Sequence, residues 1–353
     1  MNLTAPSQTG PCVSVVIPAR NEEENIGDCL RSLLEQGPVQ GREIEIIVAD
    51  DGSADQTAAI ARDIASANHC VRVVAVPPLP EGWIGKTHAL RFAVGLARGE
   101  WLLFTDADTR HRPGKLADVV ERAAREGLDW ISFSPEQEAQ TWWEKAVIPF
   151  VFQQLARRYP LDRVNDPNDP LAAANGQYIL VRRRVYAALG GHRMVRNCVL
   201  DDVMLARVVK EARVPMRFEA GRGIARTRMY RRFPDMWRGW TKNLFLLYDR
   251  DYGAICRASA ELACRYLLPA VCGPALVLLG SGWAAGAGAG LLCYLAWEHW
   301  RYGRELSDQD RGARTALLLP GALLFLLVLW NSTLRYYGRE DIEWKGRRYR
   351  ATA

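Results

Sequence analysis

The chain lacks the paired cysteines of metal sites and disulfide frameworks. Its eight cysteines are scattered over 353 residues, and no two of them form a CxxC pair. Three lie inside apolar segments, so we interpret the cysteines as small buried hydrophobic residues in a protein of a reducing compartment. The first eleven residues are polar and lack an apolar core, and we expect no signal peptide there. Residues 1–12 are predicted to form a flexible N-terminus.

A P-loop and a recognised nucleic-acid-binding motif are absent as well. A loop of the GxxxxGK[ST] type would need a glycine where the chain has Pro80. The net charge is +6, with arginines crowded between residues 222 and 242, but no recognised nucleic-acid motif accompanies them. We therefore predict no nucleic-acid partner. Basic residues beside apolar sequence instead favour an anionic membrane surface on the cytoplasmic side.

Short β-branched runs alternate with helical stretches from residue 13 to about 219, which is the pattern of a mostly parallel α/β sheet. The predicted strands are 13–17, 44–49, 71–76, 101–105 and 130–133. The predicted helices are 25–36, 57–67, 86–98, 114–126 and 204–211. A hydrophobic content of 49% supplies enough core for one large domain and an appendage.

Two clusters of acidic residues directly follow predicted strands. Asp50 and Asp51 close one strand, and Asp106-Ala107-Asp108 closes another. Ligands of open α/β sheets bind at the carboxyl ends of strands, so we expect a shared site for a metal and a phosphorylated ligand. Asp50 or Asp51 is suited to accept a hydrogen bond from the imide nitrogen of uracil or from a ribose hydroxyl.

The DxD triplet is the sharper of the two clusters. Alternate residues of an extended segment point the same way, so Asp106 and Asp108 are predicted to converge on one hard cation that keeps waters and bridges substrate phosphates. A solvated turn is the alternative interpretation of this triplet.

Two further segments carry candidate ligand contacts. The turn of residues 18–23 follows the first strand and offers backbone amides and carbonyls to a planar base, although a helix-capping turn has the same composition. Lys86 follows Gly85 at a predicted helix start, where a cation and free amides suit a diphosphate or ribose. A loop ending in a capped helix explains the second segment equally well.

Asp201 and Asp202 open the predicted helix 204–211. Carboxylates favour helix N-termini because of the helix dipole. A base near an acceptor hydroxyl must nevertheless be a positioned carboxylate or imidazole, and a paired acid of raised pKa suits that task. Which of the two acids acts stays open.

Two aromatic-rich segments stand outside the regular pattern. Residues 141–159 are interrupted by Pro149 and form either an interfacial amphipathic helix or a core helix. Residues 229–248 interleave arginines with aromatics, which makes Arg238, Trp237 and Trp240 candidates for contact with a diphosphate or an acceptor. A membrane-interface anchor has the same composition.

Three apolar stretches of membrane type follow, at residues 262–280, 283–297 and 316–330. Each should be helical, and we predict two to three transmembrane helices within 256–334. The loop containing Arg301 and Arg304 and the basic tail 335–353 both favour the cytoplasmic side, yet three full spans would separate them. One segment is therefore predicted to be re-entrant or interfacial.

Taken in order, these motifs resemble the family 2 inverting glycosyltransferases of the GT-A fold, over residues 13 to about 248. Residues 174–178, Gly190-Gly191-His192 and the tail 342–347 resemble the membrane-bound bacterial subgroup associated with hopanoid and carotenoid glycosylation. The segments that carry the family resemblance are 16–23, 49–53, 85–90, 106–108 and 201–202.

The resemblance implies a GT-A nucleotide-diphospho-sugar transferase domain at 13–250, with a Rossmann-like mixed sheet and C-terminal transmembrane helices in the inner (cell) membrane, multi-pass, with the catalytic domain cytoplasmic. It implies a nucleotide-sugar donor, UDP-linked by preference, a lipid acceptor and Mg²⁺ or Mn²⁺. The donor-binding positions are Pro18, Ala19, Asn21, Glu22, Asp50, Asp51, Lys86 and Asp106. Asp106 and Asp108 take the metal, and Asp202 acts as base beside Asp201.

Two departures from the family pattern limit what the resemblance implies. The usual Glu-Asp pair is Asp201-Asp202 here, and the QxxRW element of processive synthases is not intact because Arg238 and Trp240 have another spacing. Processive synthesis is therefore disfavoured, and we predict transfer with inversion. The alternatives are transfer to a polyprenyl phosphate, whose anionic acceptor needs little base assistance, and a non-catalytic sugar-nucleotide-binding membrane protein.

Overall fold

The computed structural model describes residues 10, 12–305, 316–338 and 342–349, and it divides into two compact units. Unit 1 contains Met1–Glu138 and Tyr159–Met229, and unit 2 contains Ala139–Arg158 and Tyr230–Ala353. The predicted flexible N-terminus lies outside the described residues except at 10 and 12, as do 339–341 and 350–353 of the predicted tail.

Unit 1 is built on one mixed sheet of eight strands in the order β3-β2-β1-β4-β7-β6-β8-β5. β7 pairs antiparallel with both β4 and β6, and β5 pairs antiparallel with β8, whereas the other pairings are parallel. The strands are β1 (Val13–Ala19), β2 (Glu45–Asp50), β3 (Val71–Ala75), β4 (Trp101–Phe104), β5 (Thr109–His111), β6 (Trp130–Gln137), β7 (Ile179–Arg182) and β8 (Met216–Thr227).

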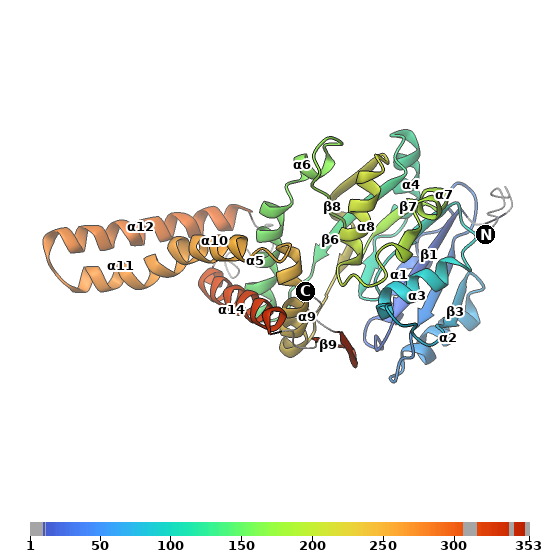
Figure 1. Cartoon of the computed structure of the whole chain (residues 1–353), viewed down its shortest axis with the longest axis horizontal. Coiled ribbons are helices and arrows are strands. Elements are labelled where there is room, and N and C mark those ends of the chain that lie inside the picture. Colours follow the sequence, from blue (N-terminus) through green and yellow to red (C-terminus); the bar gives the residue numbers. More distant parts are fainter. Residues whose placement is uncertain (1–9, 11, 306–315, 339–341, 350–353) are drawn as a thin grey trace. The chain divides into compact units, whose positions relative to one another are not determined.

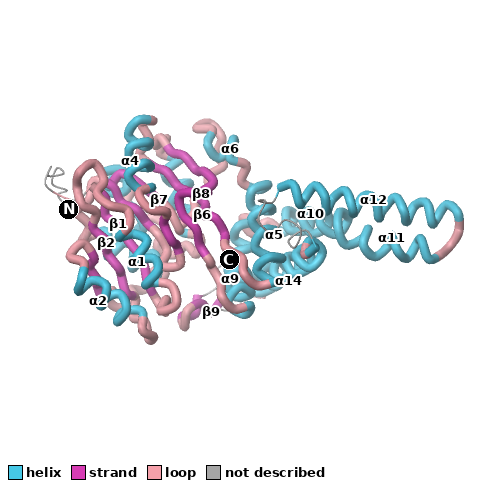
Figure 2. Tube along the Cα trace, turned by 180° about the vertical axis from the view of Figure 1, so that it is seen from behind, coloured by secondary structure: helices cyan, strands magenta, loops and turns pink. Residues whose placement is uncertain are grey.

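Helices cover both faces of this sheet, and the alternation of β1 explains why. Val15 and Ile17 point into one hydrophobic core with α1, α2 and α4, while Val16 points into a second core with α3 and α8. Figure 2 shows α1, α2 and α4 on the face toward the viewer. The helices are α1 (Ile26–Leu34), α2 (Thr57–Ala67), α3 (Gly85–Val94), α4 (Lys115–Arg125), α6 (Leu161–Asn165), α7 (Arg183–Ala188), the 3₁₀ turn η1 (Gly191–Arg193) and α8 (Asp201–Glu211).

The topology brings distant segments to one edge of the sheet. β1, β2 and β4 are parallel, so their carboxyl ends lie at the same edge. β7 runs the other way, with Ile179 opposite Phe104, and therefore begins where β4 ends. The residues just before β7 consequently lie beside the DxD triplet, although more than 60 residues separate them in the chain.

Unit 2 is helical apart from a short hairpin of β9 (Ile342–Trp344) and β10 (Arg347–Tyr349). α14 packs against both α5 and α9, and α11 and α12 run side by side as a helical hairpin (Figures 1 and 2). The helices are α5 (Trp142–Arg158), α9 (Phe233–Leu247), α10 (Tyr252–Leu262), the π-helical turn η2 (Ala263–Leu267), α11 (Leu268–Leu278), α12 (Gly282–Glu305) and α14 (Leu318–Tyr337).

The three apolar stretches are helical, as predicted. Among the described residues, two segments are long and apolar enough to cross a membrane, Tyr252–Leu278 and Leu318–Tyr337. The stretch within α12 is not one of them, and it is rich in glycine and alanine, which are less apolar than leucine. The basic loop that contains Arg311 and Arg314 lies outside the described part of the chain.

Candidate active site

The loops after β1 and β2 are tied together by side-chain to backbone hydrogen bonds. Asn21 adopts a left-handed backbone with φ of 52°, its Oδ1 accepts from the Ala54 N–H at 2.9 Å, and its own N–H donates to Ser53 Oγ at 3.1 Å. The Glu22 N–H donates to Thr57 Oγ1 at 2.7 Å. Two of the residues predicted to bind the donor therefore hold the rim of the site in place.

Asp50 and Asp51 are both buried at the end of β2. Asp50 Oδ1 accepts a hydrogen bond from the Ser53 N–H at 3.2 Å, which fixes the turn that follows. The backbone N–H of Asp51 donates to the Ala19 carbonyl at 2.9 Å, and Arg20 donates to the Asp51 carbonyl. The structure thus gathers Ala19, Asp50 and Asp51, and their contact with a nucleoside stays a prediction.

The DxD segment is a turn and not an extended strand end. The Thr109 N–H donates to the Asp106 carbonyl at 3.1 Å, and Ala107 is buried in the core of unit 1. The prediction of an extended backbone here, on which both carboxylates would point the same way, is therefore wrong. Asp106 and Asp108 flank a buried alanine at a turn, and the two carboxylates have different partners.

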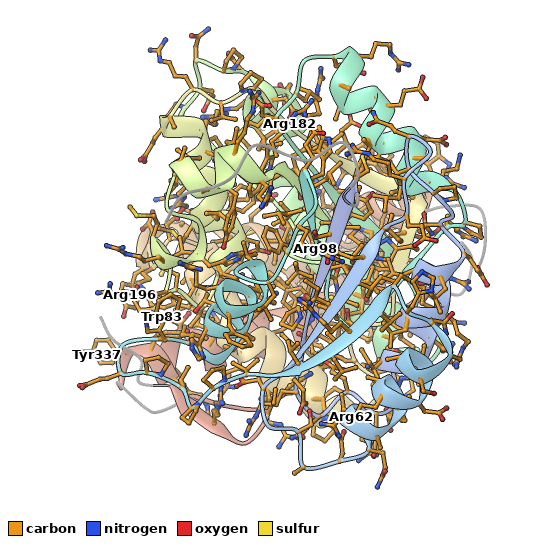
Figure 3. The ribbon with its side chains drawn as sticks, turned by 90° about the vertical axis from the view of Figure 1, so that its right-hand side faces the viewer. Arg62, Trp83, Arg98, Arg182, Arg196 and Tyr337 are labelled. Carbon is orange, nitrogen blue, oxygen red and sulfur yellow. The ribbon has the colours of Figure 1, made fainter. Side chains whose placement is uncertain are left out.

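Lys86 is the cation of this cluster, and α3 holds it there. Its Nζ lies 2.8 Å from Asp106 Oδ1 and 4.0 Å from Asp201 Oδ1. Both the Ile84 N–H and Thr87 Oγ1 donate to the Arg196 carbonyl, at 2.8 and 2.7 Å, which joins the start of α3 to the segment before α8. Figure 3 shows Trp83 next to Arg196 at this junction.

The electrostatics of Lys86 follow from its neighbours. Burial alone would lower the pKa of Lys86, but the carboxylates of Asp106, Asp201 and Asp202 outweigh it and raise the pKa. Lys86 therefore stays protonated in this cluster. It neutralises only part of the negative charge of three acids.

Asp201 and Asp202 open α8 and titrate very differently. Burial and the neighbouring charge of Asp201 raise the pKa of Asp202 to about 6. Burial would also raise the pKa of Asp201, but Lys86 and His192 outweigh it and keep the pKa low. Asp202 Oδ2 accepts from the Gly176 N–H and Oδ1 from the Val203 N–H, each at 2.8 Å. Asp202 is therefore a fixed carboxylate that titrates near neutral pH.

Three residues of this neighbourhood are absent from the predicted site. Gly176 contacts Asp202, and Gln177 Nε2 lies 3.4 Å from Asp108 Oδ1. His192 Nε2 lies 3.7 Å from Asp201 Oδ2, while its Nδ1 is 2.8 Å from the Tyr186 hydroxyl. The segments 174–178 and 190–192 stood out in the sequence only through resemblance, because their proximity to the acids depends on the reversed strand β7.

Substitution of Gly176 tests how tightly Lys86 and Asp202 are packed. A Cβ at this position would lie 2.9 Å from Lys86 Nζ and 3.5 Å from Asp202 Oδ2. We expect Gly176→Ala to displace the flexible lysine and lower the turnover of the protein roughly tenfold, because small misplacements at a reacting centre are costly. Thermal unfolding should change little. Gly290→Ala, which has open space around its Cβ, is the matched control, and equal turnover of both variants would contradict the assignment.

The third predicted group lies in unit 2. Trp240 is buried against Phe152 and Tyr230, with edge-to-face ring contacts at 6.1 and 6.2 Å. Arg238 is exposed and pairs with Asp235 at 2.7 Å, and Trp237 packs on Phe233. Packing accounts for Trp240, whereas contact of Arg238 or Trp237 with a diphosphate or acceptor stays a prediction.

The residues around the DxD turn suit a hard divalent cation. Asp106 and Asp108 supply oxygen ligands on a partly exposed turn. Within the described ranges no three His, Cys, Asp or Glu side chains gather into a closed metal site. Two carboxylates on an open turn are compatible with a Mg²⁺-like ion, which uses one or two protein carboxylates and completes its shell with water and phosphate oxygens. Metal binding by Asp106 and Asp108 stays a prediction.

Comparison with solved structures identifies the fold. A mannosyltransferase from Pyrobaculum calidifontis, solved with GDP-Man and Mn²⁺, superposes with a TM-score of 0.53 at 19% sequence identity. The superposition covers 94% of this chain and 88% of that one. The mixed sheet with helices on both faces is therefore a GT-A fold.

The sequence comparison identifies the family. The sequence model of glycosyl transferase family 2 matches residues 14–190, half of the chain, and the chain belongs to this family. 4,4'-Diaponeurosporenoate glycosyltransferases of Staphylococcus haemolyticus (strain JCSC1435) and Staphylococcus aureus (strain USA300) are each 28% identical to it, over 67% and 66% of the chain. The matched part spans 62% and 60% of those relatives' own lengths. Membership of a family of transferases favours a catalytic protein over the non-catalytic sugar-nucleotide-binding alternative.

Proposed function

We propose that the protein transfers a sugar from a nucleotide diphosphate donor to a lipid or membrane-associated hydroxyl acceptor, with inversion at the anomeric carbon. The observation that carries this proposal is Asp202, a fixed carboxylate of raised pKa beside Lys86 and the DxD turn. A single displacement needs a base on the acceptor side and positive charge on the diphosphate side, and this cluster supplies both.

The donor side of the site consists of the β1 and β2 loops and Lys86. Asp51 and the backbone around Ala19 are proposed to bind the nucleoside, and Lys86 the diphosphate. Asp106 and Asp108 would hold Mg²⁺ or Mn²⁺, which when bound offsets the negative charge that develops on the departing diphosphate. The family relation and the oxygen ligands support this proposal, and a UDP-linked sugar is the donor we favour.

The acceptor is proposed to be lipid-like, and the catalytic domain to lie on the cytoplasmic side of the inner membrane. The relatives named for 4,4'-diaponeurosporenoate support such an acceptor. Two apolar helical segments support attachment to a membrane. Charge supports it too, because unit 2 holds 20 basic and 12 acidic residues, a net +8, against 26 and 28 in unit 1, a net −2. An anionic membrane surface attracts unit 2, whose net charge is positive, and does not attract unit 1.

The pKa of Asp202 gives the proposal a pH dependence. A base acts in its ionised form, which is present above its pKa and lost as the pH falls through it. With the pKa of Asp202 raised to about 6, kcat/KM should be level near pH 8 and fall tenfold per pH unit well below 6. A profile of kcat/KM from pH 5 to 9 measures this. Activity that is level down to pH 5 would contradict the role of Asp202, and it is the result that an anionic polyprenyl phosphate acceptor would give.

A direct test of the reaction type uses purified protein in detergent with UDP- and GDP-sugars and a membrane lipid extract. We expect transfer with one of the donors, its loss on chelation of divalent ions and its recovery on addition of Mn²⁺ or Mg²⁺. The anomeric configuration of the product, read by proton NMR, should be opposite to that of the donor. Retention of configuration would reject the single-displacement mechanism.

A further inference from the structure

We infer that α14 does not cross the membrane, and that the α11–α12 hairpin is the only part of the described chain that inserts deeply, entering and leaving on the side of the catalytic domain. This inference rests on the proposed membrane attachment and specifies its topology. It removes the conflict between the basic loop near 301–314 and the basic tail, because both then lie on one side.

One face of α14 is covered by protein along its whole length. In its first half, a Cβ at Gly321 would lie 2.4 Å from the Ala146 carbonyl of α5, and the rings of Phe325 and Phe150 are 5.4 Å apart. In its second half, Ser332 Oγ accepts from the Phe245 N–H of α9 at 3.0 Å. The Tyr336 hydroxyl also donates to a carbonyl of α9, that of Lys242, at 2.9 Å.

α5 and α9, which form most of the packing against α14, are not transmembrane helices, although α10 and η2 also contact α14. α5 has 17 residues and α9 has 15, fewer than the roughly 20 that a span requires. They carry Lys145, Arg238 and Lys242, and charged side chains are costly inside hydrocarbon. A spanning α14 would have to take these two helices into the bilayer with it.

The opposite face of α14 is a largely exposed apolar stripe, which α10 contacts at two residues: Trp330 Nε1 donates to Ser259 Oγ at 3.0 Å, and the ring of Tyr337 meets that of Tyr252. Its members recur at intervals of four and three residues, which places them on one side of the helix. They are Leu323, Leu327, Trp330, Leu334 and Tyr337, with 38 to 75% of their surface exposed. A helix with one apolar face and one face bound to charged helices fits the plane of the membrane interface, with the stripe in the acyl layer.

The α11–α12 hairpin, in contrast to α14, is apolar and exposed over most of its length. No charged residue occurs between Arg265 and Glu298, and large apolar side chains such as Leu278 and Trp283 at its turn are 85% and 79% exposed. The two helices approach closely at glycines, since a Cβ at Gly288 would lie 2.6 Å from the Gly273 carbonyl. Close contact of this kind is typical of helix pairs in membranes.

Charged residues mark the base of the hairpin, where α12 returns. Glu298 is buried and accepts from Arg265 Nε at 2.8 Å and from Arg301 Nη2 at 2.9 Å. This ion cluster joins η2 to α12, so the two arms begin and end at the same level. With 1.5 Å per residue, each arm is roughly 20 to 25 Å long, which suits insertion as one hairpin and not as two independent spans.

The test places reporters on the otherwise intact chain in a bacterial host. Green fluorescent protein, which fluoresces only when it folds in the cytoplasm, and alkaline phosphatase, which is active only outside it, are fused in separate experiments after Ala353. We expect a fluorescent fusion in the first case and an inactive phosphatase in the second. The inverse pattern, with active phosphatase and no fluorescence, would overturn the inference.

Single-cysteine labelling provides an independent measurement. In a background without the native cysteines that keeps transfer activity, Ser66→Cys on exposed α2, Ser307→Cys between α12 and α14 and Thr352→Cys in the tail are treated with a membrane-impermeant maleimide. All three should react in inside-out vesicles and none in right-side-out ones. Reaction of Ser307→Cys and Thr352→Cys from opposite sides would show that α14 crosses the membrane, and reaction of Ser307→Cys from the side opposite to Ser66→Cys would show that the hairpin does not return; either result would overturn the inference.

Flotation with vesicles of anionic phospholipid separates this inference from the proposed function. Protein that floats and has its tail on the catalytic side supports both. Protein that floats with its tail on the opposite side overturns only the topology proposed for α14. Protein that stays at the bottom of the gradient rejects the proposed membrane attachment itself, and the topology falls with it.

Discussion

Asp202→Asn should abolish sugar transfer while leaving donor binding intact. The variant keeps the shape of the side chain and an oxygen that accepts from the Gly176 N–H, but it removes the group that takes the acceptor proton. General-base catalysis contributes about 10² to 10⁴ in rate, so a loss of that size is expected in kcat. Initial rates of labelled-sugar transfer measure it.

Two controls separate this effect from loss of structure. Asp118→Asn changes a carboxylate on α4 that pairs with Lys115 and is 62% exposed, and it should transfer sugar at the normal rate. The affinity of Asp202→Asn for the nucleotide donor, measured by calorimetry, should stay within a few-fold of the unaltered protein. Normal turnover of Asp202→Asn would reject the assignment and favour an acceptor that is already ionised.

Lys86→Met should produce the second large effect, and it should change the pH profile as well as the rate. Lys86 is the cation that lies 2.8 Å from Asp106 and 4.0 Å from Asp201, so its removal leaves three neighbouring carboxylates without it. Loss of an adjacent opposite charge raises a carboxyl pKa by about 1 to 3 units. The acidic limb of the kcat/KM profile should therefore move from near pH 6 to higher pH.

We expect the rate of Lys86→Met at pH 7 to fall by roughly 10², because protonation of the base and weaker binding of the diphosphate act together. Lys115→Met, on the exposed surface of α4, is the matched control and should keep both rate and profile. If the acidic limb of the kcat/KM profile of Lys86→Met stays at the same pH, Lys86 does not act on Asp202, whatever the turnover rate of the variant.

The sheet could be predicted from sequence where each strand carries its own signal. The runs that became β1, β2, β3 and β4 are β-branched and bounded by turns, and their helices have clear apolar faces. β5, β7 and β8 were not predicted. β5 has only three residues, β7 leads directly into α7 with no turn residue between them, and β8 has no regular alternation of buried and exposed residues. The antiparallel pairings of β7 make the sheet mixed. Because β7 had no signal of its own in the sequence, the mixed sheet could be predicted only from the family resemblance.

The candidate site was predictable in its acids and not in its arrangement. Asp50, Asp106 and Asp202 stand at strand ends or at a helix start, where local sequence predicts ligand contacts. The ion pair of Lys86 with Asp106 and the contact of Gly176 with Asp202 join segments far apart in the chain, and no local pattern encodes them. A turn at Ala107 was only the alternative interpretation, and it was taken to be solvated, because the burial of Ala107 depends on helices packed beneath it.

Label transfer into lipid tests the central claim most directly. Membrane vesicles that contain the protein are incubated with labelled UDP- and GDP-sugars, and the products are divided between organic solvent and water. We predict that label from one donor enters the organic phase, that vesicles with Asp202→Asn yield none, and that chelation of divalent ions suppresses it. Label found only in water-soluble saccharide, with none extractable into organic solvent, would contradict the proposal of a lipid acceptor.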